Sequence, residues 1–370
     1  MRSLKIKDIC DKGSSNLKQK DVEGKQGKYP VFGASGYISS IDSYHQDKDY
    51  IAIVKDGSGI GRVSFMPAYS SVIGTLQYIL PKKGFDIKYI SYCLQSLDLS
   101  KYKQGAAIPH IYFRDYGERF VNVEDDENEQ HRIVELLDAE FAKIDAIKAN
   151  AEKQLQWAKD LFQSALKDLL IPKEGWEEKS LKEVGLTQTG TTPSMSHKKY
   201  YENGIMPFIK PSEINYDGLG GINYDTQKLS LLGAEKGRVF NEGSIFMVCI
   251  GATIGKLGIS NKIVSCNQQI NVLTPKECYC NKFIYYAMLN PYFVNNVIKE
   301  GTSAQATLPI ISKGKWEQLT IYLPSLSEQQ IIVQKLDLLS KKVKQLQSNY
   351  EKTIALCNDL KQALLKDIFG

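Results

Sequence analysis

The chain repeats part of itself, and this internal repeat limits the possible folds more than any other feature. Residues 129–170 and 328–369 align without a gap at an offset of 199, and more than a third of the 42 aligned positions are identical. A repeat of this kind indicates two copies of one structural unit. The 370 residues therefore form two related halves rather than two or three unrelated domains.

Both copies of the repeat have the pattern of a long helix. Apolar residues recur at alternating spacings of four and three, and neither copy contains Gly or Pro before Pro172 and Gly370. Ser327 is the expected N-cap of the second helix. We expect the helices, each roughly 60 Å long, to pair with each other as an antiparallel coiled coil; two independent linker helices are the alternative. The expected seam consists of Ile332, Leu336, Leu339, Val343, Leu346, Tyr350, Thr353, Cys357, Leu360 and Leu364, with Ile133, Leu137, Glu140, Ile144, Ile147, Ala151, Gln154, Ala158, Leu161 and Ala165 at the equivalent positions.

The segments outside the helices also resemble each other, although more weakly. The matches pair 54–63 with 248–257 at an offset of 194, 29–32 with 206–209 at 177, and 3–5 with 180–182 at 177. Short apolar runs bounded by glycine, such as 50–54 and 244–248, predict buried strands. The predicted fold is therefore α+β, with a globule at 1–126, a helix at 127–172, a second globule at 173–326 and a second helix at 327–370.

Composition and charge exclude several classes of protein. With 42% hydrophobic and 24% charged residues, the chain is neither disordered nor collagen-like. The longest apolar run, 245–252, is too short to span a bilayer, and no secretory signal is visible. The seven scattered cysteines suit a reducing cytoplasm. The chain has a formal net charge of +5. The helical segments have a net charge of −1, so the globules have a net charge of +6. A mildly positive surface of this kind suits binding to nucleic acid and binding to a protein equally well.

Candidate catalytic and metal motifs find little support in the sequence. The run from Gly57 to Arg62 has glycines at G-x-G-x-G spacing and precedes a strand, whereas a phosphate-binding loop precedes a helix. A tight strand–turn–strand hairpin with positive φ explains this run and its copy, Gly251 to Leu257. Cys278 and Cys280 form a lone C-x-C without further zinc ligands. The four histidines, His45, His110, His131 and His197, form no triad, so no catalytic constellation is found.

A set of motifs recurs in order through both globules. They are Gly27–Gly36 and Gly105–Ile111 in the first globule, and Thr189–Ser194, Gly204–Ile214, Ala252–Lys256, Asn267–Ile270 and Leu323–Gln329 in the second. With these motifs and its two-globule, two-helix repeat, the chain resembles the DNA-specificity subunit of type I restriction–modification systems, which act in host defence. The resemblance covers essentially the whole chain.

The resemblance implies a function that the residues alone leave open. Each globule would be a target-recognition domain for one half of a bipartite double-stranded DNA site. The helices would set the non-specific spacer and dock two methyltransferase (modification) subunits, which carry S-adenosylmethionine. Restriction/translocase subunits that use ATP and Mg²⁺ would join through them. This chain would itself bind no cofactor or metal and would not be an enzyme.

The resemblance also suggests which side chains approach DNA. The loops concerned lie near the glycine hairpin and near the turns at Pro109 and Pro309. Arg and Lys can bind phosphates or guanine, and Gln and Asn can pair with adenine; for any single residue, the alternative is an ordinary turn or a solvated surface position. The candidates are Lys55, Ser58, Arg62, Lys103, Gln104, His110, Tyr112 and Arg114 in the first globule, and Lys210, Ser212, Thr253, Lys256, Asn267, Gln268, Gln269, Ser303, Gln305 and Thr307 in the second.

Two other functions remain as alternatives. A non-enzymatic coiled-coil scaffold whose globules bind proteins would show no salt-dependent affinity for DNA. A nucleotide-dependent enzyme using Gly57–Gly61 would bind mononucleotides saturably.

Overall fold

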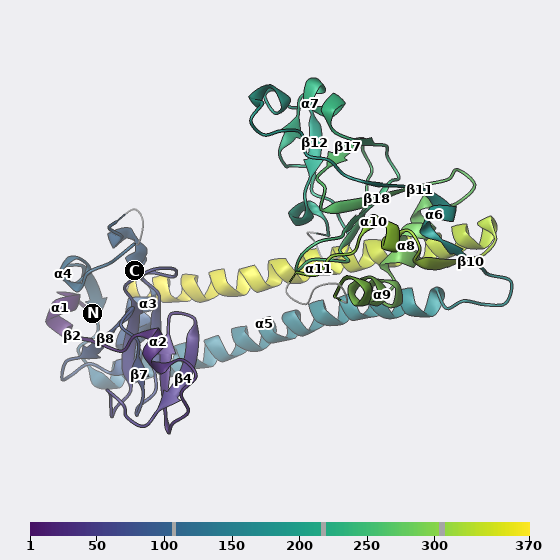
Figure 1. The fold of residues 1–370 in the computed structure, drawn as a ribbon. Coiled ribbons are helices and arrows are strands. Elements are labelled where there is room, and N and C mark those ends of the chain that lie inside the picture. The colour runs from purple at the N-terminus through teal and green to yellow at the C-terminus, as the bar shows by residue number, and fades with distance from the viewer. Residues whose placement is uncertain (106–108, 216–219, 303–307) are drawn as a thin grey trace. The chain divides into compact units, whose positions relative to one another are not determined.

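The computed structural model describes residues 1–105, 109–215, 220–302 and 308–370, and the chain forms two compact units (Figure 1). Unit 1 consists of Met1–Ala151 and Lys352–Gly370, and unit 2 of Glu152–Glu351. The unit boundaries fall inside the two long helices, α5 (Glu127–Leu169) and α11 (Leu326–Phe369). Each unit therefore consists of a globule together with the adjoining parts of both helices.

Unit 1 contains three antiparallel or mixed sheets. A four-stranded sheet has the order β2-β8-β5-β6, a three-stranded sheet the order β4-β3-β7, and β1 pairs with β9. The strands are β1 (Arg2–Lys5), β2 (Cys10–Ser14), β3 (Tyr29–Gly33), β4 (Gly36–Ile41), β5 (Tyr50–Val54), β6 (Val63–Met66), β7 (Ser71–Val72), β8 (Leu76–Pro81) and β9 (Phe120–Val123); the short helices are α1 (Ile6–Ile9), α2 (Gln19–Val22), α3 (Ile87–Gln95), η1 (Leu99–Tyr102) and α4 (Phe113–Tyr116).

Unit 2 repeats this architecture with one additional strand in its second sheet. The orders are β11-β18-β15-β16 and β13-β12-β17-β14, and β10 pairs with β19. The strands are β10 (Glu177–Ser180), β11 (Gly185–Thr189), β12 (Met206–Ile209), β13 (Lys228–Leu229), β14 (Val239–Phe240), β15 (Ile245–Val248), β16 (Leu257–Ile259), β17 (Val264–Cys266), β18 (Ile270–Pro275) and β19 (Thr320–Leu323); the helices are α6 (Leu181–Val184), η2 (Lys198–Tyr200), η3 (Pro211–Glu213), α7 (Leu231–Lys236), α8 (Asn281–Leu289), α9 (Pro291–Thr302) and α10 (Lys313–Trp316).

Strand registers show which residues of the two units are equivalent. Val31 pairs with Ser71 in unit 1 as Phe208 pairs with Ser265 in unit 2, which confirms the predicted offsets of 177 and 194. The predicted match of 3–5 with 180–182 is wrong by two residues. Lys5 and Ser180 are the N-caps of the equivalent helices α1 and α6, so the offset there is 175.

The glycine turn after the central strand has the predicted hairpin geometry. Strand β5 is wholly buried because it lies between two neighbours within its sheet and its apolar side chains fill the core. Gly57 has φ 84° and its copy Gly251 has φ 90°, a conformation that glycine adopts without a steric penalty. The N–H of Gly61 closes the turn by donating to the Val54 carbonyl at 2.8 Å.

The long helices contribute to the core of each unit. In unit 1, Lys361 on α11 donates a hydrogen bond to Asp145 on α5, and Lys148 on α5 donates one to Asn358 on α11. The two helices therefore run antiparallel there. The expected seam is only partly buried: Ile144, Ala151 and Ala158 are buried on α5 and Val343 and Cys357 on α11, whereas Ile147, Leu161, Leu346 and Leu360 are exposed. A heptad pattern shows which face is apolar, but it does not show what covers that face.

The start of α11 differs from the expectation by two residues. The helix begins at Leu326, and the Ser325 hydroxyl accepts a hydrogen bond from the N–H of Glu328 at 3.4 Å. Ser325 rather than Ser327 is therefore the N-cap. No helix among the described residues is long and apolar enough to cross a membrane.

Candidate nucleic-acid interface

The glycine turn of unit 1 is tied to the segment that carries most of the first globule's candidates. The N–H of Gly57 donates to the Pro109 carbonyl at 3.1 Å, and the N–H of Ile111 donates to the Lys55 carbonyl at 3.0 Å. Gln104 and His110 exchange backbone hydrogen bonds at 2.8 Å in each direction. These bonds hold the side chains of two distant segments together.

Two carboxylates organise the side chains at this place. Asp56 accepts a hydrogen bond from Lys55 Nζ at 2.8 Å, and its other oxygen lies 2.6 Å from His110 Nδ1. Asp115 accepts from Gln104 Nε2 at 2.8 Å. The sequence did not indicate either aspartate, because a carboxylate that binds a side chain far away in the sequence leaves no local pattern.

An aromatic side chain and an arginine complete the group. The Arg114 guanidinium lies 4.7 Å over the ring of Tyr112, whose ring is stacked 6.3 Å from that of His110. Tyr112 and Arg114 are exposed. The unit 1 cluster thus consists of Lys55, Asp56, Gln104, His110, Tyr112, Arg114 and Asp115. A planar guanidinium held on an aromatic face is preorganised for phosphate or guanine recognition.

The other three candidates of the first globule lie outside this bonded group. Ser58 is exposed in the glycine turn and Lys103 is exposed beside Gln104. Arg62 donates from Nη1 to the Ala34 carbonyl at 2.9 Å, so it points toward the turn between β3 and β4.

In unit 2 the candidates gather at the end of a parallel strand pair. Strands β12 and β17 run parallel, with Ile209 opposite Cys266. The residues that follow these strands, Lys210 and Asn267, therefore lie at the same end of the sheet. The N–H of Asn267 donates to the Ile209 carbonyl at 3.1 Å. This end of the sheet therefore presents a cation beside an amide.

The turn Asn267–Gln269, here called the amide turn, is internally bonded. Asn267 Nδ2 donates to Gln269 Oε1 at 2.8 Å, and the N–H of Gln269 donates to Asn267 Oδ1 at 3.1 Å. Gln268 is exposed, and its Oε1 accepts a hydrogen bond from the Thr192 hydroxyl. The NH₂ group of Gln268 takes no part in that bond, so the Gln268 amide is the group in this turn best placed to contact the edge of a base.

A close approach of two loops supports the amide turn. A Cβ on Gly190 would lie 2.2 Å from the Asn267 carbonyl oxygen, so only glycine fits there. The N–H of Thr191 donates to the Cys266 carbonyl at 2.9 Å, and Arg238 donates to the Thr189 carbonyl. No sequence signal marked Arg238, whereas Thr192 lies within the motif Thr189–Ser194.

Two cysteines beneath the amide turn act as packing groups. Burial raises the pKa of Cys249 to about 11 and also raises the pKa of Cys266. Both remain protonated thiols at neutral pH, and the Cys249 thiol donates to the Gln269 carbonyl at 3.1 Å. Neither is a nucleophile in this state.

The remaining candidates of the second globule have varied surroundings. Lys210 Nζ donates to Gln227 Oε1 at 2.9 Å, and the Ser212 hydroxyl donates to Glu213 at 2.8 Å. Thr253 and Lys256 are half-buried in the glycine turn. Ser303, Gln305 and Thr307 lie outside the described residues.

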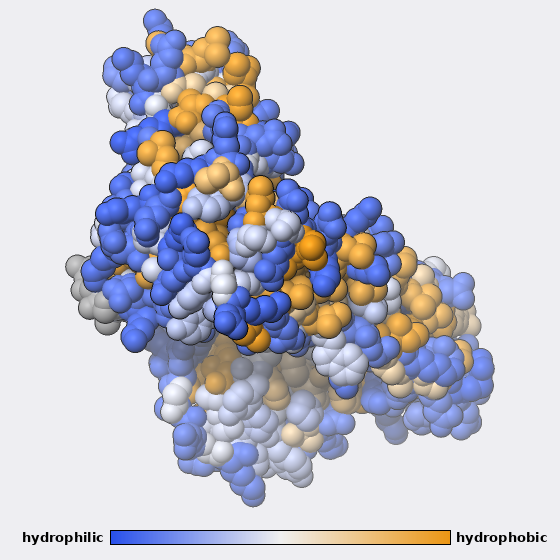
Figure 2. All heavy atoms as spheres, turned by 90° about the vertical axis from the view of Figure 1, so that its right-hand side faces the viewer, coloured by the Kyte–Doolittle hydropathy of each residue, from blue (hydrophilic) through white to orange (hydrophobic). Residues whose placement is uncertain are grey.

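The opposite end of the same sheet carries exposed apolar side chains next to exposed lysines such as Lys262. Ile205 and Ile263 directly precede β12 and β17, and both are more than half exposed, as is Leu231 at the start of α7. Figure 2 shows hydrophobic atoms gathered at the top of the view, over the part of unit 2 that carries α7 and β12. The end with Lys210 and the amide turn combines a cation with side-chain amides, a combination that suits phosphates and base edges.

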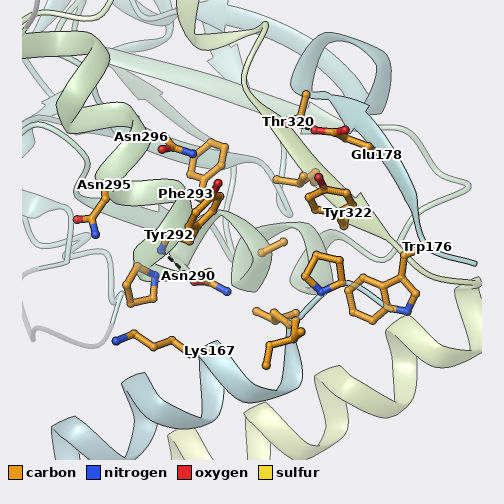
Figure 3. A pocket seen from close by; sticks show the side chains of 16 residues that line it. Lys167, Trp176, Glu178, Asn290, Tyr292, Phe293, Asn295, Asn296, Thr320 and Tyr322 are labelled. Atoms are coloured by element: carbon orange, nitrogen blue, oxygen red, sulfur yellow. Dashed lines mark hydrogen bonds between the residues drawn. The ribbon is translucent and has the colours of Figure 1, made fainter. Parts of the chain in front are cut away.

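A cavity of about 660 Å³ lies elsewhere in unit 2 (Figure 3). It is bordered by the end of α5, by β10 and β19, and by the α8–α9 junction. Tyr292 of α9 and Trp176, which directly precedes β10, form part of its wall. None of the candidate DNA-contact residues that the structure describes lines it. In the described part of the chain, no group of three or more His, Cys, Asp or Glu side chains is arranged to hold a metal.

Comparison with known proteins gives a consistent result. The family model described as the type I restriction modification DNA specificity domain matches residues 1–156 and 173–355. Among curated proteins, the HindI specificity subunit of Haemophilus influenzae is 30% identical over 153 residues, which are 41% of this chain and 32% of that protein. The EcoR124I/EcoR124II specificity subunit of Escherichia coli is 26% identical over 262 residues, which are 68% of this chain and 62% of that protein.

The match therefore spans less than two thirds of the length of these relatives. A solved chain from work on complex assembly and conformational transition of the type I R-M system is 18% identical, with a TM-score of 0.72 over 98% of this chain and 96% of that chain. That likeness shows a shared fold.

Proposed function

The chain belongs to the family of type I restriction modification DNA specificity domains, and from this premise we propose that it selects the DNA target of a type I restriction–modification complex. Each globule reads one half of a bipartite site. The observation that carries this proposal is the pair of repeat-related units, each with a cluster of amide or cationic side chains on its globule.

The two clusters differ in chemistry, so the two half-sites differ in sequence. Unit 2 offers the amide of Gln268, and amides pair best with adenine in the major groove. Unit 1 offers the stacked Arg114 and, in the same cluster, Lys55, two cations suited to guanine or to phosphate. An asymmetric bipartite target follows from these differences.

The helices serve as spacer and as docking surface in this proposal. They form an antiparallel coiled coil that fixes the distance between half-sites and binds two methyltransferase subunits. Large apolar side chains are exposed on both helices, which supports a protein-binding role for them. They are Leu136, Ile147, Trp157 and Leu161 on α5 and Leu326, Ile331, Leu338, Leu346, Leu356 and Leu360 on α11.

The chemistry of the complex resides in the partners. The methyltransferase subunits bring S-adenosylmethionine, and the restriction/translocase subunits use ATP and Mg²⁺. This chain supplies recognition without catalysis, in the cytoplasm.

The test is methylation of DNA by the complex assembled with its methyltransferase. Methylome sequencing should reveal a bipartite motif, and Gln268→Ala should relax recognition at one half-site only, by about 1 to 3 kcal/mol for one base pair. Gln318→Ala, at an exposed position between α10 and β19 and outside the long helices, is the matched control. Equal loss at both half-sites would contradict the assignment of Gln268.

A salt series separates this function from the protein-binding scaffold. Affinity for duplex DNA should fall steeply with salt, since phosphate contacts release counterions. Affinity independent of salt, with the methyltransferase present, would favour the scaffold.

A further inference from the structure

A three-residue polar contact joins the globule of unit 1 to its long helix. Asp138 on α5 accepts a hydrogen bond from Lys88 Nζ at 2.8 Å and another from the Tyr92 hydroxyl. Lys88 and Tyr92 lie four residues apart on α3, so they project from one face of that helix. One carboxylate on α5 is therefore held from two points on a neighbouring helix.

Unit 2 contains the same contact at equivalent positions. Asp337 on α11 accepts hydrogen bonds from Lys282 Nζ and the Tyr286 hydroxyl on α8, both at 2.6 Å. The offsets are 194 for the lysine and tyrosine and 199 for the aspartate. Within the nine residues of α3 and α8, only three positions are identical, and the lysine and tyrosine are two of them.

A buried glutamine makes a second attachment eight residues before each aspartate. Gln130 accepts from the N–H of Asp86 at 2.7 Å and donates to the carbonyls of Gly84 and Glu124 at 3.0 and 2.8 Å. The glutamine therefore binds the segment just before α3 and the segment just before α5. It is wholly buried.

The equivalent glutamine of unit 2 makes the corresponding bonds. Gln329 accepts from the N–H of Cys280 at 3.0 Å and donates to the Pro324 carbonyl at 2.9 Å. Cys280 corresponds to Asp86 and Pro324 to Glu124. The four residue types Lys, Tyr, Asp and Gln are thus identical in both units, although the loops of the two globules have diverged.

The spacing of the two attachments determines what they can hold. Eight residues of helix span about 12 Å, and two points that far apart fix both the position of a globule along its helix and its rotation about it. Apolar packing alone is non-directional, whereas hydrogen bonds to fixed partners depend on angle. The polar contacts therefore supply directional restraint in addition to the shared core.

We propose that these four residues, here called the clamp, are positioning residues that set how strictly the protein measures the spacer between its half-sites. The inference rests on the proposed function. A globule held at one angle on its helix presents its reading edge at one distance and rotation along the duplex. A loosened clamp lets the globule tilt and reach half-sites one base pair nearer or farther.

The experiment measures binding of the methyltransferase complex to duplexes with fixed half-sites and a spacer varied by one or two base pairs around the optimum. Tyr286→Phe removes only the hydroxyl, and Asp337→Ala removes the acceptor. Asp359→Asn, on an exposed position of α11, is the control for a lost carboxylate. Thermal denaturation of each variant is recorded alongside.

Both clamp variants should keep the half-site sequence preference of the wild type. The preference for the optimal spacer over its neighbours should fall by about fivefold in Tyr286→Phe, which loses one hydrogen bond, and by more in Asp337→Ala, which loses two. The control keeps the wild-type profile. A wild-type spacer profile in Tyr286→Phe, or an equal loss of affinity at every spacer, overturns the clamp. If Asp337→Ala fails to fold, Tyr286→Phe still decides. A wild-type complex without a bipartite preference overturns the proposed function instead.

Discussion

Replacement of Gln329 by leucine should destabilise unit 2 by a predictable amount. The side chain is almost fully buried and makes two hydrogen bonds, one from the N–H of Cys280 and one to the carbonyl of the buried Pro324. Each is worth about 1 kcal/mol, and a buried group left unpaired costs about 1 to 3 kcal/mol. Leucine has a similar size and leaves little cavity, so Gln329→Leu should cost about 2 to 4 kcal/mol.

The assay is urea denaturation followed by tryptophan fluorescence. All three tryptophans of the chain, Trp157, Trp176 and Trp316, lie in unit 2, and Trp316 is fully buried. The signal therefore reports unfolding of the unit that contains the substitution. Gln334→Leu, at an exposed position of the same helix, should change stability by no more than about 0.5 kcal/mol.

A second substitution at the same position tests the hydrogen-bond assignment. Gln329→Glu keeps the acceptor for Cys280 but turns a carboxylate toward the Pro324 carbonyl, so it should be less stable than Gln329→Leu at neutral pH. It should recover on acidification, because a protonated carboxyl can donate. The reasoning is refuted if Gln329→Leu unfolds within about 0.5 kcal/mol of the wild type, or if Gln329→Glu is the more stable variant at neutral pH.

Two further predictions concern unit 2. Gly190→Ala should displace the amide turn, since the new Cβ would clash with the Asn267 carbonyl oxygen. Binding to one half-site should weaken by about tenfold or more, which is measured with duplexes mutated in one half-site at a time. Binding equal to that of the wild type would contradict the close approach. Hydrogen bonds from Lys313 and Thr187 lower the pKa of Glu317 below 4.5, so its charged form stabilises unit 2 above that pH. This contribution is lost as the pH falls through the lowered pKa. Glu317→Gln should flatten the acid limb of the tryptophan-fluorescence denaturation profile of unit 2 below about pH 5, and an unchanged limb would exclude this carboxylate as its source.

The sequence predicted the repeat, the buried strands and the glycine turns because each depends on local spacing. The turn at Gly57 needs positive φ whatever surrounds it, and strand β5 is apolar throughout because both its faces are buried. The copy at Gly251 follows the same rule. These features could be predicted since they are determined within a few residues.

Features set by distant contacts could not be predicted. The carboxylates of Asp56 and Asp115 orient His110 and Gln104 across sequence separations of 54 and 11 residues. No residue pattern near either aspartate indicates these hydrogen bonds. Arg62 is a candidate DNA contact by its place in the glycine turn, and its hydrogen bond to the carbonyl of Ala34 could not be predicted. Side-chain pairing between segments depends on tertiary structure, which periodicity does not encode.

The division of the helices between the units has a consequence for synthesis on the ribosome. Unit 2 is one continuous stretch, Glu152–Glu351, whereas unit 1 needs Lys352–Gly370, and its core includes Cys357, Leu365 and Phe369. The N-terminal globule therefore emerges first but completes its core last, after the whole of unit 2 has been made. Such long-range closure is slow and leaves apolar surface exposed meanwhile, so the nascent N-terminal globule is the part of this protein most in need of protection by chaperones.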